Sequence, residues 1–416
     1  MPETFKTSSM KRKTSRFIPL LALCLGCAWP SRAQITDLVN FNYTNGGIPE
    51  GGLTLSGSTL YGTTSGGGAN SDGEVFSVPV SGGTPTVLAT FNSLNGQDPA
   101  GVLTLSGSIL YGTTQVGGPY NLSGDSGEGV VFSLPVSGGT PTILGTFYGS
   151  TGQNPAGVLT LSGSTLYGTT MFGGASNYGV VYSVPVGGGT PTVLVSFNGT
   201  NGYYPVGGLT LIGSTLYGAT EGGGTNNDGE VFSLPVGGGT PAILASFNGA
   251  NGNSPYGGLM RIGSTFYGTA GFGGAYNEGV VFSVPVSGGT PTVLATFNGT
   301  NGEYPNAGLT LSSDGSTLYG SASSGGAYGD GVVFSVPVGG GSPTILGSFN
   351  GTNGLGPNAG LTLSSDGSTL YGTAADGGAN EEGVVFSVAV PEPGSAMLAV
   401  TGGLSFLLFR RRQANA

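Results

Sequence analysis

The chain has 416 residues, of which 86 are glycine and only 7% are charged. No strict Gly-X-Y period accompanies the glycine, which excludes a collagen helix, and a hydrophobic content of 37% excludes a disordered chain. Between residues 34 and 390, Arg261 is the single basic residue against eighteen acids, a formal charge of −17. Nucleic-acid binding needs clustered Lys and Arg, so the composition excludes that class of function.

Residues 1–33 predict an export signal. Basic residues up to Arg16 precede the apolar run FIPLLALCLGCAW, and Ser31-Arg32-Ala33 supplies the small residues that place a cleavage site between Ala33 and Gln34. A buried N-terminal helix and a lipoprotein lipidated at Cys27 are the alternatives. Both cysteines of the chain lie in this segment, so cleavage would leave a mature protein without a disulfide or a thiol.

Residues 34–390 contain seven copies of one unit. A Leu-Tyr-Gly or Phe-Tyr-Gly element marks each copy, and its tyrosine recurs at intervals of 50 to 56 residues, at Tyr61, Tyr111, Tyr167, Tyr217, Tyr267, Tyr319 and Tyr371. In the first copy, turn residues such as Ser-Gly and Gly-Gly-Thr-Pro separate four strand-like runs, GLTLS, STLYGTT, GEVFSV and TPTVLATF. Four short antiparallel strands per unit and a period of about 50 residues predict an all-β fold, a seven-bladed β-propeller.

The two ends of the repeat region are out of phase. The run ITDLVNFNYTNGG at 35–47 matches the fourth-strand run PTVLATFNSLNGQ at 85–97, whereas the region ends on a third-strand run at 383–390. We therefore expect Ile35–Phe41 to pair with Gly383–Val390 and complete the last blade. Such closure removes the free sheet edges, which favours a propeller over a β-solenoid or an open string of units.

The third strand of most copies carries a proline near its end. The six prolines are Pro79, Pro135, Pro185, Pro235, Pro285 and Pro337. Because proline has no N–H to donate to a ladder, we expect each third strand to end near the preceding Ser-Val or Ser-Leu pair.

The order LYGTT, then Gly-Gly, then GVVFSVPV resembles the GloVer tandem repeat of exported bacterial proteins, over essentially all of residues 34–390. The Gly-Gly doublet after the second strand also resembles kelch repeats, although the tryptophan typical of kelch is missing from this region. The resemblance implies a repeat propeller and no particular activity.

Residues 391–416 resemble a PEP-CTERM sorting signal. The motif Val390-Pro391-Glu392-Pro393 precedes the apolar stretch Ala396–Phe409 and three arginines, Arg410, Arg411 and Arg412. The apolar stretch is short for a spanning helix, which needs about 20 residues, and an ordinary anchor helix is the alternative. The resemblance implies a Gram-negative protein held transiently in the inner membrane, processed by an exosortase-type enzyme, and left at the cell surface or released.

The strand order predicts two unlike faces of the ring. The loops between second and third strands and the loops that join blades share one face, and the tight hairpins share the other. The hairpins hardly vary between copies, whereas the longer loops vary and carry Tyr, Asn, Asp and Glu. Tyrosines stack on sugar rings and carboxylates accept sugar hydroxyls, so this is the candidate ligand face, with Tyr203, Tyr204, Tyr304, Asp228 and Glu278. Plain solvated loop tips are the alternative.

The chain contains no histidine, which excludes Ser-His-Asp and His-metal chemistry. No cofactor is expected, with calcium at Asn70–Asp72–Glu74 or Asn226–Asp228–Glu230 as an alternative. We expect a non-enzymatic binding or adhesion module in an extracellular polysaccharide setting, with a neutral glycan or a surface protein as partner. A glycan-active enzyme with paired carboxylates and a passive component of the cell-surface matrix are the alternatives.

Overall fold

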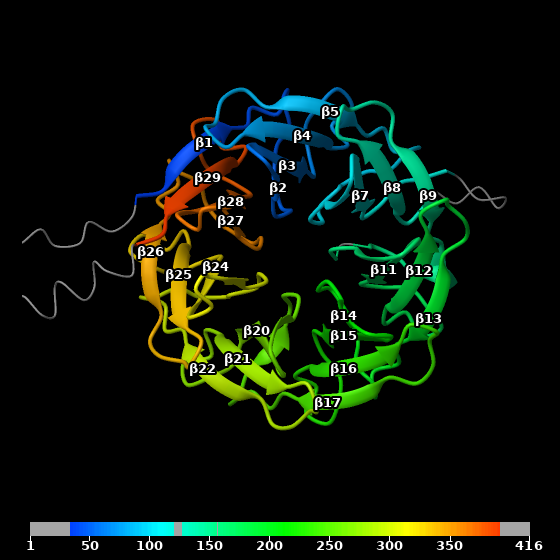
Figure 1. The fold of residues 1–416 in the computed structure, drawn as a ribbon, viewed down its shortest axis with the longest axis vertical. Helices are drawn as coiled ribbons and strands as arrows, with labels where there is room; N and C mark the ends of the chain where they lie inside the picture. Colours follow the sequence, from blue (N-terminus) through cyan, green and yellow to red (C-terminus); the bar gives the residue numbers. More distant parts are fainter. Residues whose placement is uncertain (1–33, 120–126, 156, 392–416) are drawn as a thin grey trace, which may run out of the picture. The chain divides into compact units, whose positions relative to one another are not determined.

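The computed structural model describes residues 34–119, 127–155 and 157–391, which form a ring of seven antiparallel sheets (Figure 1). The predicted all-β, seven-bladed propeller is confirmed. The predicted export signal at residues 1–33 and the predicted sorting segment beyond Pro391 lie outside the described residues. The one helical element within them is the short 3-10 helix η1 (Gly149–Thr151), and none of their helices could cross a membrane.

Each blade has an innermost strand near the ring axis, then a second, a third and an outermost strand (Figure 1). In that order the strands are β2 (Thr54–Ser56), β3 (Thr59–Thr64), β4 (Glu74–Pro79) and β5 (Thr86–Thr90) in blade 1; β6 (Thr104–Ser106), β7 (Ile109–Thr114), β8 (Val130–Pro135) and β9 (Thr142–Thr146) in blade 2; β10 (Thr160–Ser162), β11 (Thr165–Thr170), β12 (Val180–Pro185) and β13 (Thr192–Ser196) in blade 3; β14 (Thr210–Ile212), β15 (Thr215–Thr220), β16 (Glu230–Pro235) and β17 (Ala242–Ser246) in blade 4; β19 (Met260–Ile262), β20 (Thr265–Phe272), β21 (Val280–Pro285) and β22 (Thr292–Thr296) in blade 5; β23 (Thr310–Leu311), β24 (Thr317–Ala322), β25 (Val332–Pro337) and β26 (Thr344–Ser348) in blade 6; and β27 (Thr362–Leu363), β28 (Thr369–Ala374), β29 (Val384–Ala389) and β1 (Thr36–Asn40) in blade 7. Blade 5 gains a further short strand, β18 (Asn253–Pro255), which pairs with β20.

The N-terminal strand closes the ring. Strand β1 pairs antiparallel with β29, from Thr36 opposite Ser387 to Asn40 opposite Val384, and so supplies the outermost strand of blade 7. The hydroxyl of Thr373 in blade 7 donates to the carbonyl of Gly51, just before blade 1, at 2.9 Å. The closure expected from the phase offset is therefore confirmed.

The third strands run through their prolines on the side of the second strand, where the expected early end was wrong, whereas pairing with the outermost strand does end at the Ser-Val pair. Pro79 lies opposite Thr59 of the second strand, while pairing with the outermost strand stops at Ser77. Val80 donates its N–H toward the second strand, to Ser58 O. Backbone N–H groups alternate in direction along a strand, so the side on which Pro79 lacks a donor is the side where pairing has already ended.

The hydrophobic core lies between successive blades. At each of the seven junctions, an aromatic ring at the end of one outermost strand meets a ring on the third strand of the next blade, edge to face, with centroids 4.6–5.3 Å apart. The pairs are Phe41–Phe76, Phe91–Phe132, Phe147–Tyr182, Phe197–Phe232, Phe247–Phe282, Phe297–Phe334 and Phe349–Phe386. Because both rings of each pair are buried, every blade depends on its neighbours for its core.

The glycine of the Leu-Tyr-Gly element makes room for this core. Gly218 lies opposite Phe232 in the ladder, and a Cβ at Gly218 would come within 2.8 Å of the Phe232 ring. The other six copies show the same crowding, with Tyr182 in place of phenylalanine in blade 3. The motif therefore carries glycine because a buried aromatic ring packs against the strand at this position, and not because the chain turns there.

Candidate functional site

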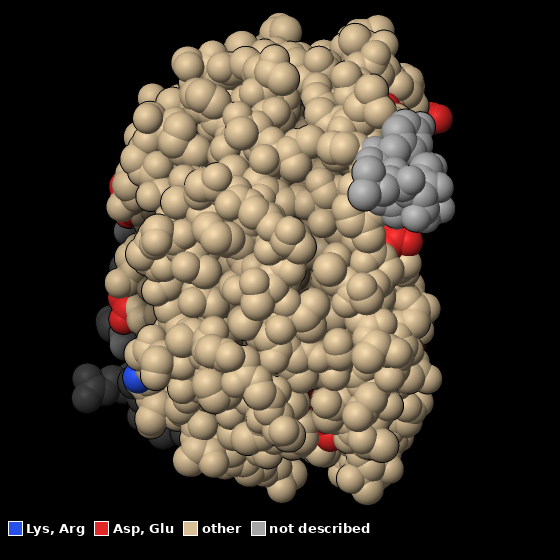
Figure 2. Space-filling view, turned by 90° about the vertical axis from the view of Figure 1, so that its right-hand side faces the viewer, with Lys and Arg blue, Asp and Glu red and all other residues tan. Residues whose placement is uncertain are grey.

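The loops between second and third strands and the loops that join blades lie together and form what we call the loop face. The flank of the ring seen in Figure 2 is almost free of charge, and Asp and Glu side chains appear at its margins. The single basic residue between 34 and 390, Arg261, lies on the innermost strand β19 next to the hairpin glycine Gly263, whose carbonyl accepts from Arg261 Nε at 2.7 Å. The charge that the described loops carry on the loop face is therefore acidic.

One backbone hydrogen bond joins the loops at all seven blade junctions. A residue of the interblade loop, the junction residue, donates its N–H to a carbonyl in the loop of the preceding blade. The donor–acceptor pairs, 3.0–3.2 Å apart, are Ile48–Glu382, Asp98–Asp72, Asn154–Glu128, Tyr204–Tyr178, Ser254–Asp228, Tyr304–Glu278 and Gly356–Asp330. The side chains of the loop face vary between blades, but the seven equivalent hydrogen bonds hold the backbone beneath them in the same arrangement. We call this set of hydrogen bonds the backbone frame.

The junction residues have left-handed backbone conformations. In six blades a residue other than glycine has φ between +55° and +57°, and in blade 7 the residue is Gly356, at +66°. For residues with a Cβ this conformation costs roughly 1–2 kcal/mol, and a β-branched residue such as Ile48 adopts it rarely. The junction residue is held by its own backbone hydrogen bond and by the backbone pairing of the residue before it, so the surrounding backbone imposes the strain.

Tyr203 and Tyr204 belong to an aromatic cluster at the junction of blades 3 and 4. The ring centroid of Tyr203 lies 4.7 Å from that of Tyr204 and 5.6 Å from that of Tyr178. Tyr204 also meets Phe172 edge to face at 5.0 Å. The ring of Tyr203 lies against Gly222, where a Cβ would collide with it. These four side chains are called the aromatic cluster below.

The other three predicted residues lie at the next two junctions. Asp228 contributes to the junction of blades 4 and 5, where its Oδ1 accepts from Asn253 Nδ2 at 2.7 Å. Tyr304 and Glu278 are joined by the backbone bond of the junction of blades 5 and 6, and the Tyr304 ring meets Phe272 at 5.0 Å. The five predicted residues therefore occupy three successive junctions on one arc of the ring rather than a single pocket.

In the two loops considered for calcium, the candidate ligand oxygens do not converge on one point. Asn70 donates its side-chain amide to Phe91 O, Asp72 accepts from the Ser93 hydroxyl, and Glu74 is turned inward with 2% of its surface exposed. Asn226 likewise donates to Phe247 O, and Glu230 is 3% exposed. In the described part of the chain, no group of three or more His, Cys, Asp or Glu side chains could hold a metal ion.

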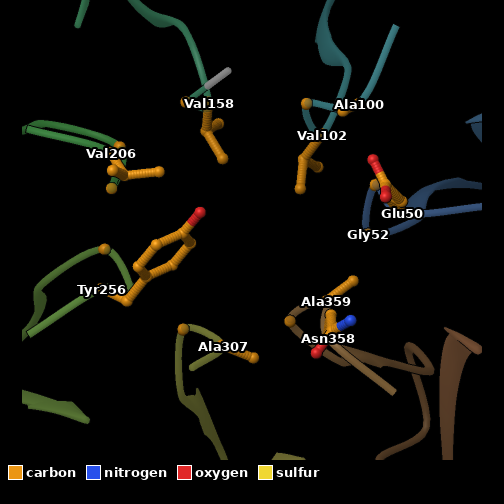
Figure 3. A pocket seen from close by; sticks show the side chains of 18 of the residues that line it. Glu50, Gly52, Ala100, Val102, Val158, Val206, Tyr256, Ala307, Asn358 and Ala359 are labelled. Carbon is orange, nitrogen blue, oxygen red and sulfur yellow. The ribbon is translucent and has the colours of Figure 1, made fainter. Parts of the chain in front are cut away.

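A cavity of about 480 Å³ opens at the ring axis, and sequence reasoning missed it (Figure 3). Its wall includes the residue that follows the proline of six interblade loops, together with the small residues after it. In chain order the described residues at that position are Glu50, Ala100, Val206, Tyr256, Asn306 and Asn358. In every copy this position lies between a constant proline and a Gly or Ala, and it changes in size and polarity from copy to copy. That contrast was a signal in the sequence.

The cavity combines an apolar wall with two polar ends. Val102, Val158 and Val206 project into it, and Tyr256 and Glu50 face each other from opposite sides (Figure 3). Burial raises the pKa of the Glu50 carboxyl, and the charges of Asp98 and Asp376 raise it further. Burial, then Glu221 and Glu50, likewise raise the pKa of the Tyr256 phenol. Acidic side chains from several blades therefore act on the two ionisable groups that face each other across the cavity.

The fold and the loop face define a β-propeller repeat protein. Residues 121–317 match the family model of the Gloeobacter/Verrucomicrobia repeat, which is the repeat that the Leu-Tyr-Gly pattern resembles. No curated protein matches the sequence significantly.

Solved structures of very different proteins are similar in fold. The quinohemoprotein alcohol dehydrogenase of Comamonas testosteroni is 10% identical with a TM-score of 0.50, covering 86% of this chain and 78% of that one. The N-terminal domain of Nup159 is 10% identical with a TM-score of 0.48, covering 86% and 96%. A puromycin-hydrolyzing peptidase of Mycobacterium tuberculosis is 13% identical with a TM-score of 0.47, covering 82% and 52%. Likenesses at this identity concern the fold alone.

Proposed function

We propose that this propeller is a non-enzymatic binding module that takes a neutral glycan on its loop face. The observation that carries the proposal is the aromatic cluster, in which Tyr178, Tyr203, Tyr204 and Phe172 pack side by side on a strained, hydrogen-bonded frame. Fixed rings bind without losing much rotamer entropy, and sugar rings stack on them. The neighbouring junctions add Asp228, Glu278 and Tyr304, whose side chains can receive hydroxyls further along a chain-like ligand.

The charge of the loop face favours a neutral glycan over an acidic one. The described residues carry one arginine, near a hairpin turn, so an anionic polysaccharide would find no cation on the loop face. Binding should therefore change little with ionic strength, since stacking and neutral hydrogen bonds are not screened by salt.

A glycan array followed by affinity measurements on the best neutral hit tests the proposal. Removing two stacking rings with Tyr203→Ala/Tyr204→Ala should weaken binding roughly 5- to 150-fold, from about 0.5–1.5 kcal/mol for each ring. Tyr328→Ala is the matched control, because Tyr328 is a 65% exposed loop tyrosine outside the cluster. Unchanged affinity in the double variant, with a loss in the control, would place the site elsewhere.

We also propose that the chain is exported and sorted to the cell surface of a Gram-negative bacterium in a polysaccharide setting. The supporting observations are the N-terminal signal pattern and the order of Pro-Glu-Pro, apolar run and arginines at the other end. Replacing Pro391, Glu392 and Pro393 with alanine should preserve export and trap the chain in the inner membrane. Unchanged fractionation and an unchanged mature mass would remove the exosortase from the proposal.

The same protein and the same array hit distinguish a binding module from a glycan-active enzyme and from a passive matrix component. A binding module holds the array hit unchanged over long incubation, whereas a glycan-active enzyme converts it. A passive component gives no array hit at all.

A further inference from the structure

We propose that the axial cavity is a second binding site, for a compact hydroxylated amine such as an amino sugar with a free ammonium group. The site shares no residue with the aromatic cluster, so it stands or falls independently of the neutral-glycan proposal.

The cavity has the size and mixed lining of a small-molecule site. Its volume of about 480 Å³ falls within the range of roughly 300–1,000 Å³ that is usual for ligand pockets. Residues from all the blades converge on it, so its shape is fixed by the closed ring and not by one loop. Gly207 illustrates how tightly the wall is built, because a Cβ there would lie 2.9 Å from Tyr256 O of the next blade.

The two faces of the cavity suit the two faces of an amino sugar. The valines at 102, 158 and 206 form an apolar wall that can pack against the C–H face of a pyranose ring (Figure 3). The Tyr256 ring, 37% exposed, lies next to Val206 and across the cavity from Glu50, and it can stack on the sugar or on its ammonium. The side-chain amides of Asn306 and Asn358 offer donors and acceptors for hydroxyl groups.

The acidic side chains in and near the cavity favour a ligand with a positively charged group. Glu50 projects into it from the side opposite Tyr256, and Asp98, Asp376 and Glu221 are close enough to act on Glu50 or Tyr256. One oxygen of Glu221, Oε2, is buried without a hydrogen-bond partner. No basic side chain lines the cavity, so nothing within its described wall neutralises these carboxylates. An ammonium placed beside Glu50 would do so, whereas a carboxylated or sulfated sugar would be repelled.

The test uses the full-length chain with D-glucosamine, N-acetyl-D-glucosamine and D-glucose as probes at about pH 7. The three sugars share the pyranose ring, and only the first carries an ammonium. Affinities come from titration calorimetry or saturation-transfer NMR. We expect glucosamine to bind about fivefold or more tightly than the other two, as one ion pair of about 1 kcal/mol requires. The preference should shrink when NaCl rises from about 50 to about 500 mM.

Three variants separate the cavity from the rest of the loop face. Glu50→Gln should abolish the preference for glucosamine and keep the shape of the site, whereas Tyr256→Ala should weaken binding of all three sugars. Glu381→Gln is the control, because Glu381 is an exposed acid of a neighbouring loop that does not line the cavity. Circular dichroism melting confirms that each variant is folded.

The outcomes are distinguishable from those of the neutral-glycan proposal. Equal affinity for the three sugars, a preference that survives Glu50→Gln, or no binding of glucosamine would each overturn the cavity proposal. Loss of binding in Tyr203→Ala/Tyr204→Ala but not in Glu50→Gln would overturn it as well, because the aromatic cluster would then hold the amino sugar. The first three of these results do not bear on whether a neutral glycan binds the aromatic cluster.

Discussion

Replacing the buried Glu74 with valine should stabilise the ring above neutral pH. Glu74 begins the third strand of blade 1, and the same position is occupied by a fully buried valine in five other blades, Val130, Val180, Val280, Val332 and Val384. Its Oε2 is buried without a hydrogen-bond partner. The fold therefore accepts an apolar side chain here, and the carboxylate gains nothing in return for its desolvation.

Burial raises the pKa of Glu74 from its ordinary value of 4.5 to about 7. The folded state thus binds a proton that the unfolded state has released, and the stability that this proton contributes is complete below about pH 4.5 and lost as the pH rises through about 7. The shift corresponds to about 3 kcal/mol, and screening by solvent around the loop lowers the expected loss between pH 5 and pH 8 to about 2 kcal/mol.

Urea denaturation at a series of pH values measures this effect. Glu74→Val should reduce the native chain's loss of unfolding free energy between pH 5 and pH 8 by about 2 kcal/mol, and the remaining loss comes from other acids with raised pKa values, such as Glu50 and Glu221. Glu230→Val, in blade 4, should act in the same direction but less strongly, because the Ser246 hydroxyl donates to Glu230 Oε1. Glu381→Gln, at an exposed loop position, is the control and should leave the slope unchanged. Parallel pH profiles for Glu74→Val and the native chain, or a less stable variant at pH 8, would refute the reasoning.

Three further substitutions test the packing. Tyr182→Phe should stabilise the chain by about 1–3 kcal/mol in chemical denaturation, because the buried hydroxyl of Tyr182 has no hydrogen-bond partner; a loss of stability would show that it does have one. Gly218→Ala should cost about 1–3 kcal/mol by crowding the aromatic core, whereas Gly237→Ala, which meets nothing within 4 Å, should cost little; equal effects would contradict the packing argument. Phe41→Ala should cost about 3–5 kcal/mol, as much as Phe349→Ala at another junction, if the N-terminal strand closes the ring in solution; a markedly smaller loss for Phe41 would indicate an open ring.

The sequence by itself determined the number of blades and the way in which the ring closes. Turn residues and the Leu-Tyr-Gly repeat are local signals, and each acts within a hairpin of a few residues, so one chain suffices to find them. The phase offset between 35–47 and 383–390 needs only a comparison of segments. The separation into a constant hairpin face and a variable loop face followed from strand order, and the structure places Tyr203, Tyr204, Tyr304, Asp228 and Glu278 in loops of the variable face.

Other features depend on which groups the closed ring brings together. The prediction for the prolines was wrong because it treated both sides of the third strand alike, whereas the outermost strand has already separated when Pro79 is reached. The left-handed backbone of Tyr204 was invisible, because five equivalent positions also carry residues other than glycine, so no glycine marked the conformation. Glu74 and Val130 are both buried, although the sequence alone suggests a solvated acid for the first and a core residue for the second.

The axial cavity is the clearest case of what tertiary structure alone decided. Glu50 and Tyr256 are about two hundred residues apart in the chain and belong to loops that have no local reason to meet. They face each other because seven blades close around one axis, and the radius of that closure is set by the packing of aromatic rings between blades. A local pattern fixes what each blade is, and only the sum of seven interblade packings fixes which side chains converge at the centre.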